Sequence, residues 1–155
     1  MSYEVLLFAH VLGATLLLGT GAGIAFFMVI SHLSNDPKLI AHVAGIVVLA
    51  DTVFTATAAV LQPVTGVLLA RDVGWPLFEG WIGVSLMLYV VVGMFWLPVV
   101  WMQIQMRNLA IEARDAGAPL PPRYHRLFWL WFACGFPAFG AVLAIVWLML
   151  TKPAF

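Results

Sequence analysis

The chain has 155 residues, of which 64% are hydrophobic and 9% charged, and its 7 basic residues balance its 7 acidic ones. A mean hydropathy of +1.05 lies far outside the range of soluble domains, so the sequence predicts an integral membrane protein surrounded by lipid bilayer. The chain has no excess of positive charge, which argues against nucleic-acid binding. Its single cysteine, Cys134, excludes an internal disulfide or a cysteine-based metal site.

Charged residues divide the chain into four apolar segments, each long enough to cross about 30 Å of hydrocarbon as a helix. The predicted spans are residues 4–32, 38–70, 80–107 and 124–152. No basic segment precedes the first span, which is also longer than the apolar part of a signal peptide, so we expect it to remain as an anchor. Short connections predict an all-α, antiparallel four-helix bundle that forms one domain over residues 1–155.

Basic residues near the span ends predict the orientation of the bundle. The first and third connections and the span ends beside them carry most of them, namely Lys38, Arg107, Arg114, Arg123 and Arg126, whereas the opposite side carries Arg71 and Lys152. This asymmetry predicts that both termini lie outside the cytoplasm. We therefore expect a multi-pass protein of the bacterial inner membrane, with its termini on the periplasmic side.

The first span combines a histidine with small side chains in the segment "FAHVLGATLLLGTGAG". The helix face that starts at His10 continues through Gly13, Ala14, Leu17 and Gly21. Haem requires a nitrogen ligand and a helix surface without bulky side chains, and this face offers both. We therefore interpret His10 as an axial ligand of haem iron and the small-residue face as the surface beneath the porphyrin.

Other residues at the depth of His10 complete this hypothesis. Gln62 or Tyr89 would hold the second ring nitrogen of His10 or approach the far side of the iron, and Arg71 would contact a propionate. The alternative is that Gly19 and Gly23 form a small-xxx-small contact for helix packing, with His10 in the headgroup region.

The second span carries a polar stripe on one helix face, formed by Asp51, Thr55, Ala58, Gln62, Thr65 and Gly66. Asp51 is expected near the bilayer centre, with no lysine or arginine inside any span to neutralise it. Burial favours the protonated carboxyl, which suits a proton relay or a hydrogen bond to a bound ligand. The alternative is a structural carboxyl bonded to Thr20 or to a backbone carbonyl.

Three further histidines are expected near the inner face. His32 and His42 flank the first connection, and His125 opens the fourth span. They are weaker candidates for a second metal or haem site, because loop histidines are commonly solvated.

The motifs "FAHVLGA", "FTATAAVLQPVTGVLLA", a "GW" opening the third span and the closing "RYHRLFWLWFACGFPAFGAVLAIVWLMLTKP" resemble a bacterial family of four-helix predicted integral membrane proteins. That family is similar to the HemJ-type protoporphyrinogen oxidases and the CopD copper-resistance group. The resemblance spans nearly the whole chain and implies haem b bound through the first-span histidine, which matches His10. Ser85 stands about where the HemJ group carries a lysine, which argues against protoporphyrinogen oxidation.

These observations favour a haem b-binding membrane protein with a redox or electron-transfer role, whose partner is a quinone or a periplasmic electron carrier. The alternatives are a HemJ-like porphyrinogen oxidase, a CopD-like copper transporter, and a structural subunit of a homo-oligomer or larger membrane complex. Copper transport is disfavoured because the methionines are scattered rather than paired.

Overall fold

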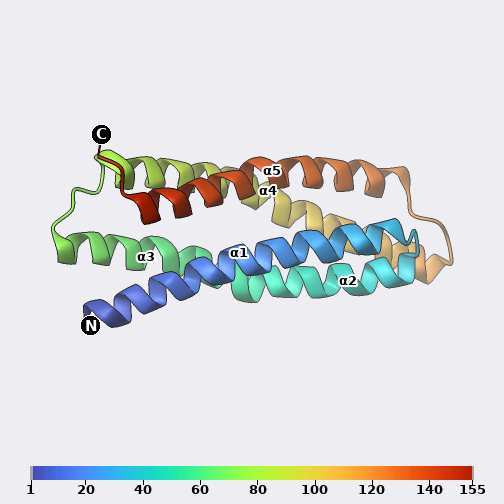
Figure 1. Cartoon of the computed structure of the whole chain (residues 1–155). Coiled ribbons are helices and arrows are strands. Elements are labelled where there is room, and N and C mark those ends of the chain that lie inside the picture. Colours follow the sequence, from blue (N-terminus) through green and yellow to red (C-terminus); the bar gives the residue numbers. More distant parts are fainter. Residues whose placement is uncertain (1, 155) are drawn as a thin grey trace.

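The computed structural model describes residues 2–154, and within this range the chain is helical, without strands (Figure 1). The elements are α1 (Tyr3–Leu33), α2 (Pro37–Ala50), η1 (Asp51–Thr55), α3 (Ala56–Val73), α4 (Gly80–Ala116) and α5 (Pro122–Thr151). Because α2, the π-helical turn η1 and α3 are continuous, the elements form four rods. The predicted all-α fold is confirmed.

Each rod is long and apolar enough to cross a membrane: Tyr3–Leu33, Pro37–Val73, Gly80–Ala116 and Pro122–Thr151. A helix satisfies its own backbone groups, which is a requirement for any segment exposed to hydrocarbon. The chain is therefore a multi-pass integral membrane protein, and the four predicted spans correspond to the four rods.

Local sequence signals explain where the rods begin and end. The second rod starts at an Asp36 cap, whose carboxylate accepts a hydrogen bond from the Lys38 backbone N–H at 2.9 Å, with Pro37 in the first turn. The second and third rods each end at a left-handed glycine, Gly74 (φ 77°) and Gly117 (φ 61°).

The third rod is longer than its predicted span. The prediction placed its end near Arg107, but α4 continues to Ala116. The added segment, "NLAIEARDA", contains three alanines together with one leucine, one glutamate and one arginine, which favour helix even where the chain leaves the apolar part of a membrane. Charge therefore marks the end of the apolar segment but not the end of the helix, which comes at Gly117.

The two halves of the bundle are packed differently. We call the half where α1 begins and α5 ends the terminal half, and the half with residues 34–36 and 117–121 the packed half. The packed half holds the main apolar core, which consists of Ile24, Met28, Ile40, Ala41, Ala44, Val47, Met102, Met106, Ala110, Tyr124, Leu127, Phe128 and Trp131. In the terminal half α3 packs mainly against α1, and α4 against α5, so the rods separate into two pairs (Figure 1).

Candidate functional site

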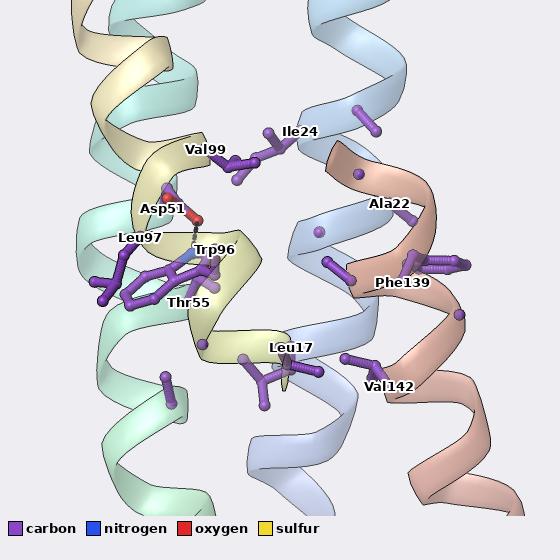
Figure 2. Close-up of a pocket in the computed structure, with 18 of the residues that line it drawn as sticks. Leu17, Ala22, Ile24, Asp51, Thr55, Trp96, Leu97, Val99, Phe139 and Val142 are labelled. Atoms are coloured by element: carbon purple, nitrogen blue, oxygen red, sulfur yellow. Dashed lines mark hydrogen bonds between the residues drawn. The ribbon is translucent and has the colours of Figure 1, made fainter. Parts of the chain in front are cut away.

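A cavity of about 920 Å³ lies inside the bundle and is lined by residues of all four rods. Its wall is mostly apolar and includes four glycines from three helices, Gly21, Gly93, Gly135 and Gly140. A Cβ added to any of these glycines would meet no neighbouring atom within 4 Å. Figure 2 shows the space between α4 and η1 on one side and α1 and α5 on the other. A mostly apolar cavity with a few polar groups is the usual form of a small-molecule site.

Only part of the predicted haem-facing surface of α1 lines this cavity. Ala14, Leu17 and Gly21 line it, as the small-residue face predicts. Gly13 does not, because the side chain of Gln62 occupies the space that its Cβ would need. Gly13 is therefore a contact point between α1 and α3, whereas Gly21 borders open space.

His10 lies one helical turn beyond Ala14, the first α1 residue on the cavity wall, and its ring is held by α3. Its Nδ1 is 2.8 Å from Thr65 Oγ1, and the ring packs closely over Gly66. Thr65 has one hydroxyl proton, which it donates to the Leu61 carbonyl at 2.7 Å. When that proton goes to the Leu61 carbonyl, the Thr65 oxygen accepts from a protonated Nδ1, and this tautomer leaves the Nε2 lone pair of His10 free.

The two residues expected to hold His10 make other contacts. Gln62 Nε2 donates to the His10 backbone carbonyl at 2.6 Å rather than to the ring, and the Tyr89 hydroxyl donates to the Ala59 carbonyl. Both residues line the cavity. The expected ring partner is thus corrected from Gln62 or Tyr89 to Thr65, which lies about one helical turn away from Gln62. Arg71 is exposed near the end of α3, on the terminal half.

Asp51 is the centre of a polar cluster on the cavity wall. Its side chain is only 4% exposed, and Oδ1 accepts a hydrogen bond from Trp96 Nε1 at 3.3 Å (Figure 2). With its amide oxygen turned toward Trp131, Gln103 donates to Asp51 Oδ2 at 3.3 Å and accepts from Trp131 Nε1 at 3.2 Å. Asp51 therefore has indole and amide partners, and the expected alternative of Thr20 or a backbone carbonyl is replaced by these side chains.

Thr55, at the end of η1, carries an unusual hydroxyl. The residue is 7% exposed and lines the cavity, and its Oγ1 lies near the Asp51 carboxyl without forming a hydrogen bond of normal geometry to any described residue. A buried polar group left without a partner costs about 1–3 kcal/mol, and π turns occur frequently at functional sites. The combination marks this wall of the cavity as a place where a ligand atom is expected.

The inner histidines are only partly brought together. His32 stacks on Phe128 with ring centroids 3.5 Å apart, and it meets His125 edge to face at 5.6 Å. Its Nδ1 lies 3.4 Å from the Tyr124 hydroxyl. His42 is exposed on α2. Within residues 2–154 no three His, Cys, Asp or Glu side chains gather as a metal site.

Sequence reasoning missed part of the cavity wall. Gly135 and Gly140 flank Pro137 in the fourth span and give it the same open surface that Gly21 gives the first. The sequence did contain a signal for these two glycines, because small residues inside an apolar span indicate either close packing or a bound group. The place of Trp131 on the cavity wall could not be predicted, since nothing in the local sequence shows that its indole faces Gln103.

Comparison with known proteins places the chain in a family. No match was found among curated proteins, nor among solved structures. The family model described as "Predicted integral membrane protein (DUF2269)" matches residues 4–153, which is nearly the whole chain and all four rods. The protein therefore belongs to the DUF2269 family of integral membrane proteins.

Proposed function

We propose that this protein binds haem b through His10 and serves as a redox component of the bacterial inner membrane. The observation that carries the proposal is the geometry around the His10 ring. Thr65 holds Nδ1 in its protonated form, so Nε2 is left with a lone pair suited to iron. Metal-binding histidines are commonly oriented in this way by a partner on the other ring nitrogen.

His10 offers the donor chemistry for haem, and the nearest space of suitable size lies one helical turn further along α1. The cavity begins one turn further along α1, at Ala14, and continues past Leu17 and Gly21. Its volume of about 920 Å³ falls in the usual range for sites of cofactor size. His10 would supply the iron ligand, this α1 face would border the porphyrin, and the exposed Arg71 would contact a propionate. Haem bound there would supply a one-electron redox centre.

Asp51 is the proposed proton-holding group. It is buried on the same cavity wall, and within the described residues the single ion pair joins Arg114 to Asp115, far from this cluster in the sequence. A carboxyl without a cationic neighbour in an apolar site can take up and release a proton as charge near it changes. The bundle would lie with its termini in the periplasm, and the electron partner would be a quinone or a periplasmic carrier.

The test is the absorption spectrum of the protein purified in detergent from haem-replete cells. The wild type should show a Soret band and about one haem per chain. His10→Ala should lose both, whereas His42→Ala, which changes an exposed histidine on α2, should keep them. A colourless wild type would contradict the proposal and would favour copper transport or a structural role in an oligomer or larger complex.

Porphyrinogen oxidation is a weaker second candidate. Ser85, which stands in place of the lysine of the HemJ group, is buried and donates its hydroxyl to the Trp81 carbonyl at 2.7 Å. It therefore offers no charge to a tetrapyrrole substrate. Restored growth of a strain that lacks this oxidation step would support the oxidase, and no restoration is expected.

A further inference from the structure

The hydroxyl of Thr55 is buried without a partner, whereas most threonine hydroxyls of the helices are bonded to the backbone. Thr15, Thr52, Thr57, Thr65 and Thr151 each donate to the carbonyl four residues earlier. Around Thr55 the helix is wound differently, because in the π turn the Asp51 carbonyl accepts the N–H of Ala56, five residues on, and no bond from the Thr55 hydroxyl to that carbonyl is formed. The local backbone thus leaves the Thr55 hydroxyl without its ordinary partner while keeping it buried on the cavity wall.

The same wall presents an acceptor beside this donor. Asp51, four residues before Thr55, also lines the cavity, and the hydrogen bonds from Trp96 and Gln103 use one lone pair on each of its oxygens. Figure 2 shows Asp51, Trp96 and Thr55 on one side of the space, with Leu17 and Val142 across from them. A ligand lying here would meet a hydroxyl and a carboxyl at one end and apolar side chains elsewhere.

The cavity reaches the lipid-facing surface of the bundle. Val60 and Leu97 line it while remaining 68% and 65% exposed, and Phe136 on α5 lines it at 66% exposed. Side chains this exposed in a membrane span face lipid, so the cavity opens sideways into the bilayer. Its occupant would arrive from the membrane rather than from water, and must therefore be lipid-soluble.

We propose that the end of this cavity beside Asp51 and Thr55, away from the haem proposed at the His10 end, binds a quinone-type molecule, a lipid-soluble ring that carries a carbonyl when oxidised and a hydroxyl when reduced. The Thr55 hydroxyl donates to the ring carbonyl, and the Asp51 carboxyl accepts from the ring hydroxyl of the reduced form. The Trp96 and Trp131 indoles beside the polar cluster offer flat apolar surfaces to the ring, and an apolar tail leaves between Val60 and Leu97. The proposal rests on the proposed redox function for its biological role, but the binding itself requires no haem.

The test is titration of decylubiquinone into the His10→Ala protein in detergent, followed by quenching of tryptophan fluorescence. Using this background separates the two proposals, because quinone binding is then measured in protein that is expected to carry no haem. Binding should be saturable. Thr55→Val, which keeps the shape of the side chain and removes the unpaired hydroxyl, should weaken binding about three- to tenfold, as expected for loss of one hydrogen bond.

Thr52→Val is the matched control, because Thr52 lies in the same π turn but is exposed and bonded to the Val48 carbonyl. Its affinity for decylubiquinone should equal that of the parent protein. Oleate, which has an apolar tail but no ring carbonyl, should not displace the quinone. Equal affinities for Thr55→Val and its parent, quenching that does not saturate, or full displacement by oleate would each overturn the proposal, whatever the haem content of the wild type.

Discussion

The ring nitrogen Nδ1 of His10 and the hydroxyl oxygen of Thr65 lie 2.8 Å apart, which joins α1 to α3 in the terminal half of the bundle. The contact favours a proton on Nδ1 when the Thr65 hydroxyl donates to the Leu61 carbonyl. A second bond, from Gln62 to the His10 carbonyl, fixes the backbone at the same level. The imidazole is therefore held by contacts that do not use Nε2.

Replacing Thr65 by valine should weaken haem binding about 10-fold or more, because partners of this kind commonly affect affinity 10- to 100-fold. Haem titration into apoprotein, followed by the Soret band, measures the change. Thr65→Ser restores the hydroxyl and should recover most of the affinity. If valine and serine variants bound haem equally, the Thr65 contact would have no part in holding the ligand.

Gly13→Ala should lower the free energy of unfolding by about 1–3 kcal/mol, because the added methyl group collides with the amide of Gln62, which must move and give up its hydrogen bond to the His10 carbonyl. Unfolding by sodium dodecyl sulfate in mixed micelles measures it. Gly19→Ala is the control, since a Cβ there meets nothing within 4 Å, and it should be neutral or slightly stabilising.

A second substitution tests whether the collision with Gln62 causes the loss of stability in Gly13→Ala. Shortening Gln62 to alanine in the Gly13→Ala background makes room for the methyl group, so the double variant should be less destabilised than the sum of the two single ones. Strict additivity would mean that the two side chains do not meet.

Asp51→Leu should destabilise the protein by about 1–3 kcal/mol, because Trp96 and Gln103 lose their acceptor inside the membrane. The cavity beside Asp51 accommodates the leucine, so steric strain is not the expected cause. A double-mutant cycle with Trp96→Phe, followed by the same unfolding assay, should give a coupling energy of about 0.5–1.5 kcal/mol. A coupling of zero would contradict the hydrogen bond.

Gly135→Leu should lower the binding of haem and of decylubiquinone while the protein stays folded. The new side chain projects into the cavity, where it meets no other atoms. Gly45→Leu is the matched control, because Gly45 in α2 also has open space around its Cβ position but does not line the cavity. Helical circular dichroism checks the fold of both variants, and equal ligand binding by the two would show that the cavity does not hold the ligand.

The four membrane helices could be predicted because charge, length and hydropathy act over whole segments. The apolar part of the third span was predicted to end near Arg107, and α4 continues beyond it because helix propensity carries the helix on to Gly117. The polar stripe of the second span was also predictable, and Asp51, Thr55, Gln62 and Thr65 are all buried.

The hydrogen-bond partners of the residues in the polar stripe could not be predicted from the sequence. Depth counting placed Gln62 beside His10, and it does bind there, but to the carbonyl instead of the ring. An error of one turn is enough to exchange Gln62 for Thr65. The π turn at Asp51–Thr55 has no clear sequence signal either, because a one-residue change in helix winding depends on the packing of the neighbouring helices.

The separation of the apolar core from the cavity has an evolutionary consequence. Side chains such as Met28, Met106 and Phe128 bring the rods together at one end, while the cavity is bordered mainly by residues at the other. Substitutions at the cavity glycines are thereby separated from the core contacts that hold the rods together, whereas Ile24 and Trp131 serve both regions. During evolution the ligand that the cavity accepts can therefore change through wall residues such as Gly93 and Gly135, while the apolar core stays intact.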